Sequence, residues 1–170
     1  MIYLDSSALM KLVRREDETE ALLEWLDLRS DQLVVTSELG RVEVLRAARR
    51  VGGRVLAEAR AVVGDLDLVP LDRAVQDVAC DLGDPLLRTL DALHLASALL
   101  LGEGLTAFIA YDRRLADAAQ VAGLVTATPG QPPLLAKIGP GSTSPDNLAA
   151  SGPTAWCRST ALRPPLRTAS

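Results

Sequence analysis

The chain has 170 residues, of which 48% are hydrophobic and 24% are charged, and its net charge is −4. This composition is typical of a globular protein, and the acidic balance argues against a broad basic surface for nucleic acid. No apolar run approaches the roughly 18 residues of a membrane span, and no export signal is recognisable, so we expect a cytoplasmic protein without a membrane partner. The two cysteines, Cys80 and Cys157, predict neither a disulfide framework nor a zinc site.

Apolar strand-like runs alternate with helical patterns as far as residue 128. We expect strands at 2–4, 32–36, 66–71, 106–112 and 124–128, and helices at 7–15, 17–29, 37–50, 53–65, 72–82, 90–102 and 113–123. Ser37 is the expected N-cap of the third helix, and Gly123 is expected to close the last one. Alternating strands and helices predict an α/β domain, in which a parallel sheet is covered by helices on both faces.

Beyond residue 128 the periodicity is lost. Eight of the ten prolines lie there, together with glycine, serine and threonine. Such a segment has few apolar groups to bury, so we expect it to be extended or disordered. The sequence therefore predicts one folded domain over residues 1–130 and a tail over residues 131–170 that does not pack.

Two aspartates follow predicted strands. Asp5 comes directly after the first strand, and Asp112 ends the stretch "FIAYD" before another helix. Because functional groups gather at the carboxyl ends of parallel strands, we expect the two carboxylates to share one edge of the sheet. An aspartate before a helix also serves as an N-cap, and the sequence alone leaves both interpretations open.

Two further acids lie within helices. Glu43 is on an inward-leaning stripe of its helix, although an exposed pair with Arg46 is the alternative. Asp91 begins the very apolar helix 90–102, where the helix dipole favours an acid, and a partly buried carboxylate there needs a partner. No lysine lies near any of the four carboxylates in sequence. We therefore expect a shared divalent cation, and a set of oxygen ligands favours Mg²⁺ or Mn²⁺.

Four stretches of the chain resemble the signature stretches of PIN-domain ribonucleases, and most of all the VapC toxins of bacterial toxin–antitoxin pairs. They are "IYLDSSALMKL", "SELGRVEVLRA", "LRTLDALHLASAL" and "FIAYDRRLADAA". The resemblance covers residues 1 to 128 in order. It implies a three-layer PIN-like fold with a central parallel sheet flanked by helices. The metal-binding and catalytic acids that it implies are Asp5, Glu43, Asp91 and Asp112, with Ser6 or Ser7 helping to bind metal or phosphate.

The resemblance implies a Mg²⁺-dependent endoribonuclease in which a metal-activated water hydrolyses an RNA phosphodiester. A toxin of this kind implies a small antitoxin partner and a homodimer. Seven arginines can hold flanking phosphates of the RNA: Arg41, Arg46, Arg49, Arg50, Arg54, Arg113 and Arg114.

Two other functions stay open at this point. One is a PIN-like module that binds without cleaving. The other is a receiver-type phosphoacceptor, which needs adjacent acids after the first strand and a late lysine, whereas Asp5 is followed by two serines. We interpret His94 as a core residue and leave it out of the site. Asp117 is interpreted as an ordinary solvent-facing helix residue.

Overall fold

The structure is a computed structural model, and it describes residues 1–82 and 86–132. Its strands are β1 (Ile2–Leu4), β2 (Val34–Ser37), β3 (Asp67–Val69), β4 (Ala107–Ile109) and β5 (Thr126–Ala127). Its helices are α1 (Ser6–Val13), α2 (Thr19–Asp27), α3 (Glu38–Val51), α4 (Gly53–Gly64), α5 (Arg73–Asp81), α6 (Thr89–Leu99) and α7 (Arg113–Val121). A short 3-10 turn, η1, covers Gly102–Gly104.

All strands run parallel in one sheet, in the order β3-β2-β1-β4-β5. The central strand β1 pairs with β4 so that Leu4 lies opposite Ile109. The backbone N–H of Asp5 continues this ladder by donating to the carbonyl oxygen of Ile109, at 3.0 Å. This register brings the residues that follow β1 and β4 to one edge of the sheet, as the sequence predicted.

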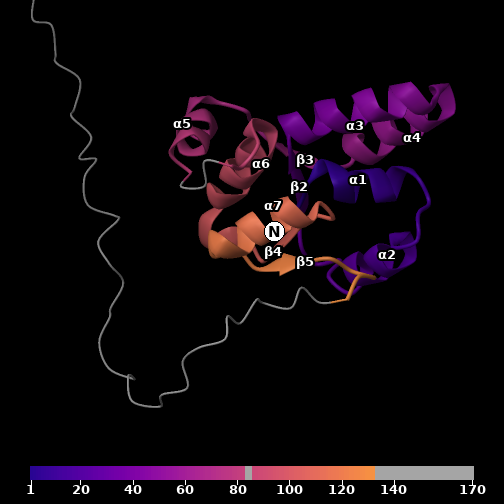
Figure 1. The fold of residues 1–170 in the computed structure, drawn as a ribbon. Coiled ribbons are helices and arrows are strands. Elements are labelled where there is room, and N and C mark those ends of the chain that lie inside the picture. Colours follow the sequence, from indigo (N-terminus) through magenta and orange to yellow (C-terminus); the bar gives the residue numbers. More distant parts are fainter. Residues whose placement is uncertain (83–85, 133–170) are drawn as a thin grey trace, which may run out of the picture. The chain divides into compact units, whose positions relative to one another are not determined.

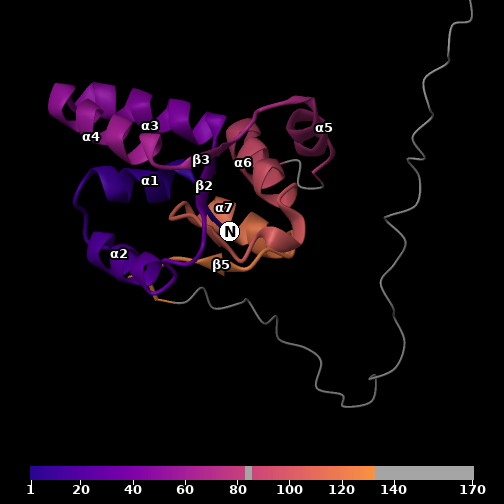
Figure 2. The ribbon, with the colours of Figure 1, turned by 180° about the vertical axis from the view of Figure 1, so that it is seen from behind.

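The sheet is covered on both faces, because alternate residues of each strand point in opposite directions. Ile2 and Leu4 belong to a core cluster with α1, α2, α3 and α4, whereas Tyr3 and Phe108 belong to a second cluster with α6 and α7. Figure 1 and the rear view in Figure 2 show α1 to α4 gathered on one side and α5 and α6 on the other. The predicted three-layer α/β fold is confirmed.

The element types predicted from periodicity are confirmed wherever the structure describes the chain, and their ends move by a few residues. Ser37 caps α3, accepting a hydrogen bond from the backbone N–H of Gly40 at 3.1 Å. Gly52, with φ of +148°, separates α3 from α4 in a conformation that other residues rarely adopt. Residues 83–85, between the predicted helices 72–82 and 90–102, and residues 133–170 of the predicted tail lie outside the described residues. Within residues 1–82 and 86–132, none of the helices has the length and apolar character to span a bilayer.

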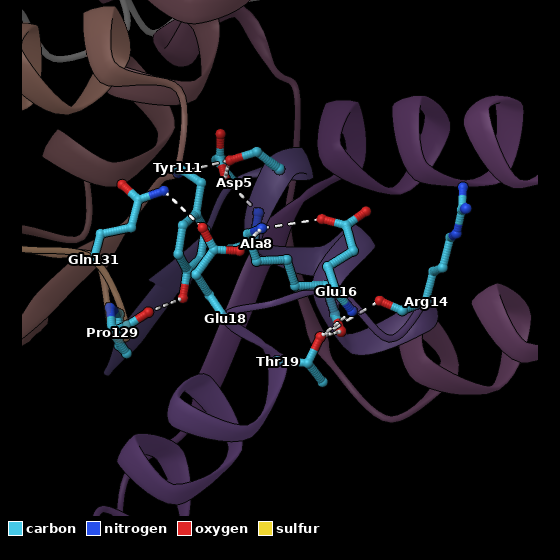
Figure 3. A network of polar contacts seen from close by, with 11 residues as sticks. Asp5, Ala8, Arg14, Glu16, Glu18, Thr19, Tyr111, Pro129 and Gln131 are labelled. Carbon is cyan, nitrogen blue, oxygen red and sulfur yellow. Dashed lines mark hydrogen bonds and ion pairs between the residues drawn. The ribbon is translucent and has the colours of Figure 1, made fainter.

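A polar network joins the end of α1 to the last described residues (Figure 3). The Lys11 ammonium is largely buried and pairs with Glu16 at 3.0 Å and with Glu18 at 2.6 Å. Gln131 donates to the other carboxylate oxygen of Glu18 at 3.0 Å, and the Tyr111 hydroxyl donates to the carbonyl of residue 129 at 2.8 Å. Lys11 is thereby paired with two acids of the segment before α2, and not with the four predicted acids.

Candidate active site

A pocket of about 410 Å³ lies where β1 and β4 end and α1 and α7 begin. It is lined by Asp5, Ser6, Ser7, Met10, Glu43, Arg88, Thr89, Leu90, Asp91, His94, Asp112 and Leu115. All four predicted acids and both predicted serines therefore meet at one pocket. A larger, mainly apolar pocket of about 700 Å³ lies beside α7, and the exposed Asp117 belongs to that one. Because the 700 Å³ pocket contains only this one acid among its described lining residues, the carboxylate chemistry belongs to the smaller pocket.

Asp5 is both an N-cap and a pocket residue. Its Oδ1 accepts the backbone N–H of Ala8 at 2.9 Å and the Ser7 hydroxyl at 2.7 Å. The side chain is only 2% exposed, and this burial raises its pKa to about 6 although both hydrogen bonds favour the charged form. The Ser7 hydroxyl also accepts the N–H of Tyr111 at 2.8 Å, so it ties the ends of β1 and β4 together.

The raised pKa of Asp5 predicts how the metal-free protein responds to pH. The folded state holds the Asp5 proton more tightly than the unfolded state, and this preference stabilises the fold. The stabilisation is fully present below pH 3.8 and is lost as the pH rises through about 6. The loss amounts to roughly 3 kcal/mol at most. In EDTA, the melting temperature of Asp5→Asn should rise relative to wild type between pH 4 and pH 7. Parallel pH profiles of the two proteins would contradict this assignment.

Glu43 is held by a buried histidine. Its Oε2 lies 2.8 Å from Nε2 of His94, whose Nδ1 lies 2.8 Å from the hydroxyl of Tyr3. Because a carboxylate only accepts hydrogen bonds, Nε2 carries the proton that is donated to Glu43. Burial alone would raise the pKa of Glu43, but the hydrogen bond and charge of His94 outweigh it and lower the pKa. The alternative of a Glu43–Arg46 pair is wrong.

Asp91 and Asp112 share a cation from their own chain. The guanidinium of Arg114 reaches Oδ2 of Asp91 through Nε at 3.1 Å and Nη2 at 3.0 Å, and Nη2 lies 3.5 Å from Oδ2 of Asp112. Asp112 also caps α7, because its Oδ1 accepts the backbone N–H groups of Arg114 and Leu115. The expectation that the four acids lack a matching partner within the chain is wrong, because Arg114 contacts Asp91 and Asp112 and His94 contacts Glu43.

The donor set can be tested against a divalent cation. Carboxylate and hydroxyl oxygens from four different elements line one pocket, which is the chemistry that Mg²⁺ and Mn²⁺ prefer. In the part of the chain that the structure describes, however, no three Asp, Glu, His or Cys side chains stand in an arrangement that could hold a metal ion. The oxygen atoms of these residues therefore suit a hard cation, but in this structure Arg114 and His94 bind three of the four acids.

Sequence reasoning missed two residues of this pocket. His94 is a buried core residue, as predicted, but it also lines the pocket and positions Glu43. The available signal was its position one helical turn after Asp91, on the same side of α6. Arg88, the N-cap residue of α6, lines the pocket as well and is exposed.

Comparisons with known proteins agree with this architecture. A family model described as PIN domain matches residues 2–121. The chain is 43% identical over 133 residues to ribonuclease VapC35 of Mycobacterium tuberculosis, and the match covers 77% of this chain and 98% of that relative. It is 45% identical over 133 residues to ribonuclease VapC47 of the same species, with coverage of 76% and 98%.

Solved structures show the same fold. One is VapC20 of M. tuberculosis, a toxin described as cleaving the sarcin-ricin loop, with a TM-score of 0.58 over 76% of this chain and all of the other, at 19% identity. Another is a toxin–antitoxin complex from Klebsiella pneumoniae, with a TM-score of 0.60 over 76% and 98% of the two chains, at 20% identity. The chain belongs to the PIN-domain family, and within it to the VapC group.

Proposed function

We propose that this protein is the toxin of a bacterial toxin–antitoxin pair and acts as a Mg²⁺-dependent endoribonuclease, with Mn²⁺ as a possible substitute. The observation that carries the proposal is the meeting of Asp5, Glu43, Asp91 and Asp112 at one pocket, in a chain 43–45% identical to ribonucleases of the VapC group. The proposed RNA substrate supports a cytoplasmic site of action. The PIN-domain match over residues 2–121 argues against the receiver-type phosphoacceptor alternative.

In the proposed reaction Asp5, Asp91 and Asp112 would hold the cation, and Glu43 would contribute directly or through a water molecule. When bound, the cation would lower the pKa of a water molecule and stabilise charge on the reacting phosphate. The protein prepares this site by fixing its carboxylates: Ser7 and the Ala8 N–H hold Asp5, and His94 holds Glu43. No side-chain nucleophile is required.

The exposed arginines of α3 answer the objection raised by the acidic net charge. Glu43, Arg46 and Arg50 are spaced by three and four residues, so they follow one another along one face of the helix. Arg46, Arg49 and Arg50 also line a shallow hollow of about 310 Å³. A row of guanidinium groups that begins one turn from a pocket acid suits the phosphates on one side of the scissile bond.

Replacing Arg46 and Arg50 together with glutamine should weaken RNA binding without altering the pocket. Each lost phosphate contact reduces the slope of log affinity against log salt by about one, so we expect a reduction of about two. RNA binding measured over a range of salt concentrations tests this. The control is the double change of Arg15 and Arg73 to glutamine, two exposed arginines outside α3, which removes the same charge. Equal slopes for both double variants would exclude α3 as the RNA-binding face.

The proposed partners follow from the same family. A small antitoxin would cover the carboxylate pocket, with an arginine of the partner in the position of the metal, and the toxin would form a homodimer. The solved toxin–antitoxin complex from K. pneumoniae is one structure that this fold resembles. Recovery of a small bound protein with the toxin from its native host would support the pair.

The experiment that separates the remaining functions is cleavage of a mixed RNA panel by the full chain. The proposed function predicts discrete fragments with Mg²⁺ and intact RNA with EDTA. A PIN-like module that only binds would retain RNA in a filter-binding assay and leave it intact under both conditions.

A further inference from the structure

The Arg114 guanidinium lies between two elements of the pocket. It donates through Nε to Oδ2 of Asp91 on α6, at 3.1 Å, and through Nη2 to Oδ2 of Asp112, the cap of α7, at 3.5 Å. Nη2 also lies 3.0 Å from Oδ2 of Asp91. The Asp91 side chain is 16% exposed and the Arg114 side chain is 37% exposed, so the contact is partly shielded from water. A hydrogen bond between two charged groups is stronger than one between neutral groups.

Without the carboxylates of Asp91 and Asp112, the position of Arg114 would be unfavourable for a cation. Arg114 belongs to the first turn of α7, where unpaired backbone N–H groups give the helix terminus a positive partial charge. Arg113, its neighbour, is exposed and has no ion pair within the described ranges. Asp91 and Asp112 therefore hold Arg114 in a place that its own helix disfavours.

We propose that Arg114 is an internal counter-ion that competes with the divalent cation for Asp91 and Asp112. This inference rests on the metal site of the proposed function. Both oxygens of Asp112 are engaged, Oδ1 by backbone N–H groups and Oδ2 by Arg114. Oδ2 of Asp91 accepts the Nε–H of Arg114 and lies 3.0 Å from its Nη2. A cation that takes these oxygens has to displace the guanidinium.

The competition sets the apparent metal affinity of the protein. If the Arg114-paired form predominates by about ten to one, the apparent affinity is about tenfold weaker than that of the open pocket. The same contact keeps two pocket acids from facing each other uncompensated in the metal-free protein. Arg114 would thus weaken metal binding and stabilise the metal-free toxin.

The matched test compares Arg114→Gln with Arg113→Gln in the full-length protein. Both variants lose one positive charge from the start of α7, but only the first loses the contacts with Asp91 and Asp112. Calorimetric titration with Mn²⁺, in the absence of RNA, should give a dissociation constant about tenfold lower for Arg114→Gln and nearly unchanged for Arg113→Gln. Without metal, Arg114→Gln should melt at a lower temperature than either wild type or Arg113→Gln.

Equal Mn²⁺ affinities of the two variants, a weaker affinity of Arg114→Gln, or no Mn²⁺ binding by any of the proteins would overturn the proposal. If Arg114→Gln does not fold, Arg114→Lys serves in its place. A single ammonium cannot reproduce the contacts of the planar guanidinium with both Asp91 and Asp112, so Mn²⁺ should again bind more tightly than in wild type. Wild-type RNA cleavage with Mg²⁺ is measured in parallel. If cleavage occurs while the Mn²⁺ affinities stay equal, the counter-ion role of Arg114 is wrong and the proposed nuclease activity is kept.

Discussion

Replacing Asp5 with asparagine should abolish RNA cleavage and leave the fold intact. Asparagine is about as good an N-cap as aspartate, so Oδ1 can keep its bonds from Ala8 and Ser7. The amide loses the negative charge that a divalent cation requires. Losing a group that only orients a metal ligand already costs 10–100-fold, so we expect cleavage to fall by about 100-fold or more.

The control for Asp5→Asn is Asp117→Asn, which removes a carboxylate from an exposed position outside the pocket. It should retain full activity. Melting curves in EDTA at pH 7 should show Asp5→Asn to be at least as stable as wild type, because burial disfavours the charged form of Asp5 and Glu43 repels it. Full activity of Asp5→Asn would show that Asp5 is only a helix cap.

Replacing Gly40 with alanine should strongly destabilise the fold. A Cβ at this position of α3 would lie 2.5 Å from Oγ1 of Thr36 and 3.2 Å from Cε1 of His94. Thr36 cannot move freely, because it is fully buried and its hydroxyl donates to the carbonyl of Leu4 at 2.8 Å. Overpacking of this kind costs about 1–3 kcal/mol, which exceeds the helix propensity gained by alanine.

The matched control is Gly53→Ala at the start of α4, where an added Cβ meets no atom within 4 Å. Thermal melting should place Gly40→Ala several degrees below wild type and Gly53→Ala at or above it. The crowding at His94 should also disturb its bond with Glu43, so cleavage by the folded Gly40→Ala protein should fall. Equal melting temperatures for the two variants would show that α3 can shift to accept the methyl group.

The sequence predicted the parts of this molecule that depend on local pattern. Periodicity located the strands and helices, and the parallel topology brought Asp5 and Asp112 to one edge of the sheet. Both aspartates proved to be helix caps that also line the pocket, so the two interpretations left open are compatible. Which of these carboxylates bind metal stays a prediction.

The polar partners of the acids could not be predicted in the same way. His94 binds Glu43 across 51 positions of sequence, and Arg114 binds Asp91 across 23. Neither contact has a helical or strand spacing, because each joins two helices that the fold alone brings together. Arg114 also follows Asp112 by two residues, which favoured its interpretation as a contact for RNA phosphate rather than as a counter-ion.

The end groups of RNA fragments produced by the full chain with Mg²⁺ test the central claim most directly. Water as the nucleophile leaves a phosphomonoester on one fragment and a hydroxyl on the other, whereas attack by the RNA's own 2′-hydroxyl leaves a 2′,3′-cyclic phosphate. The carboxylate pocket predicts phosphomonoester and hydroxyl ends, formed with Mg²⁺ and absent in EDTA and in Asp5→Asn. Cyclic phosphate ends, or equal cleavage in EDTA, would contradict it.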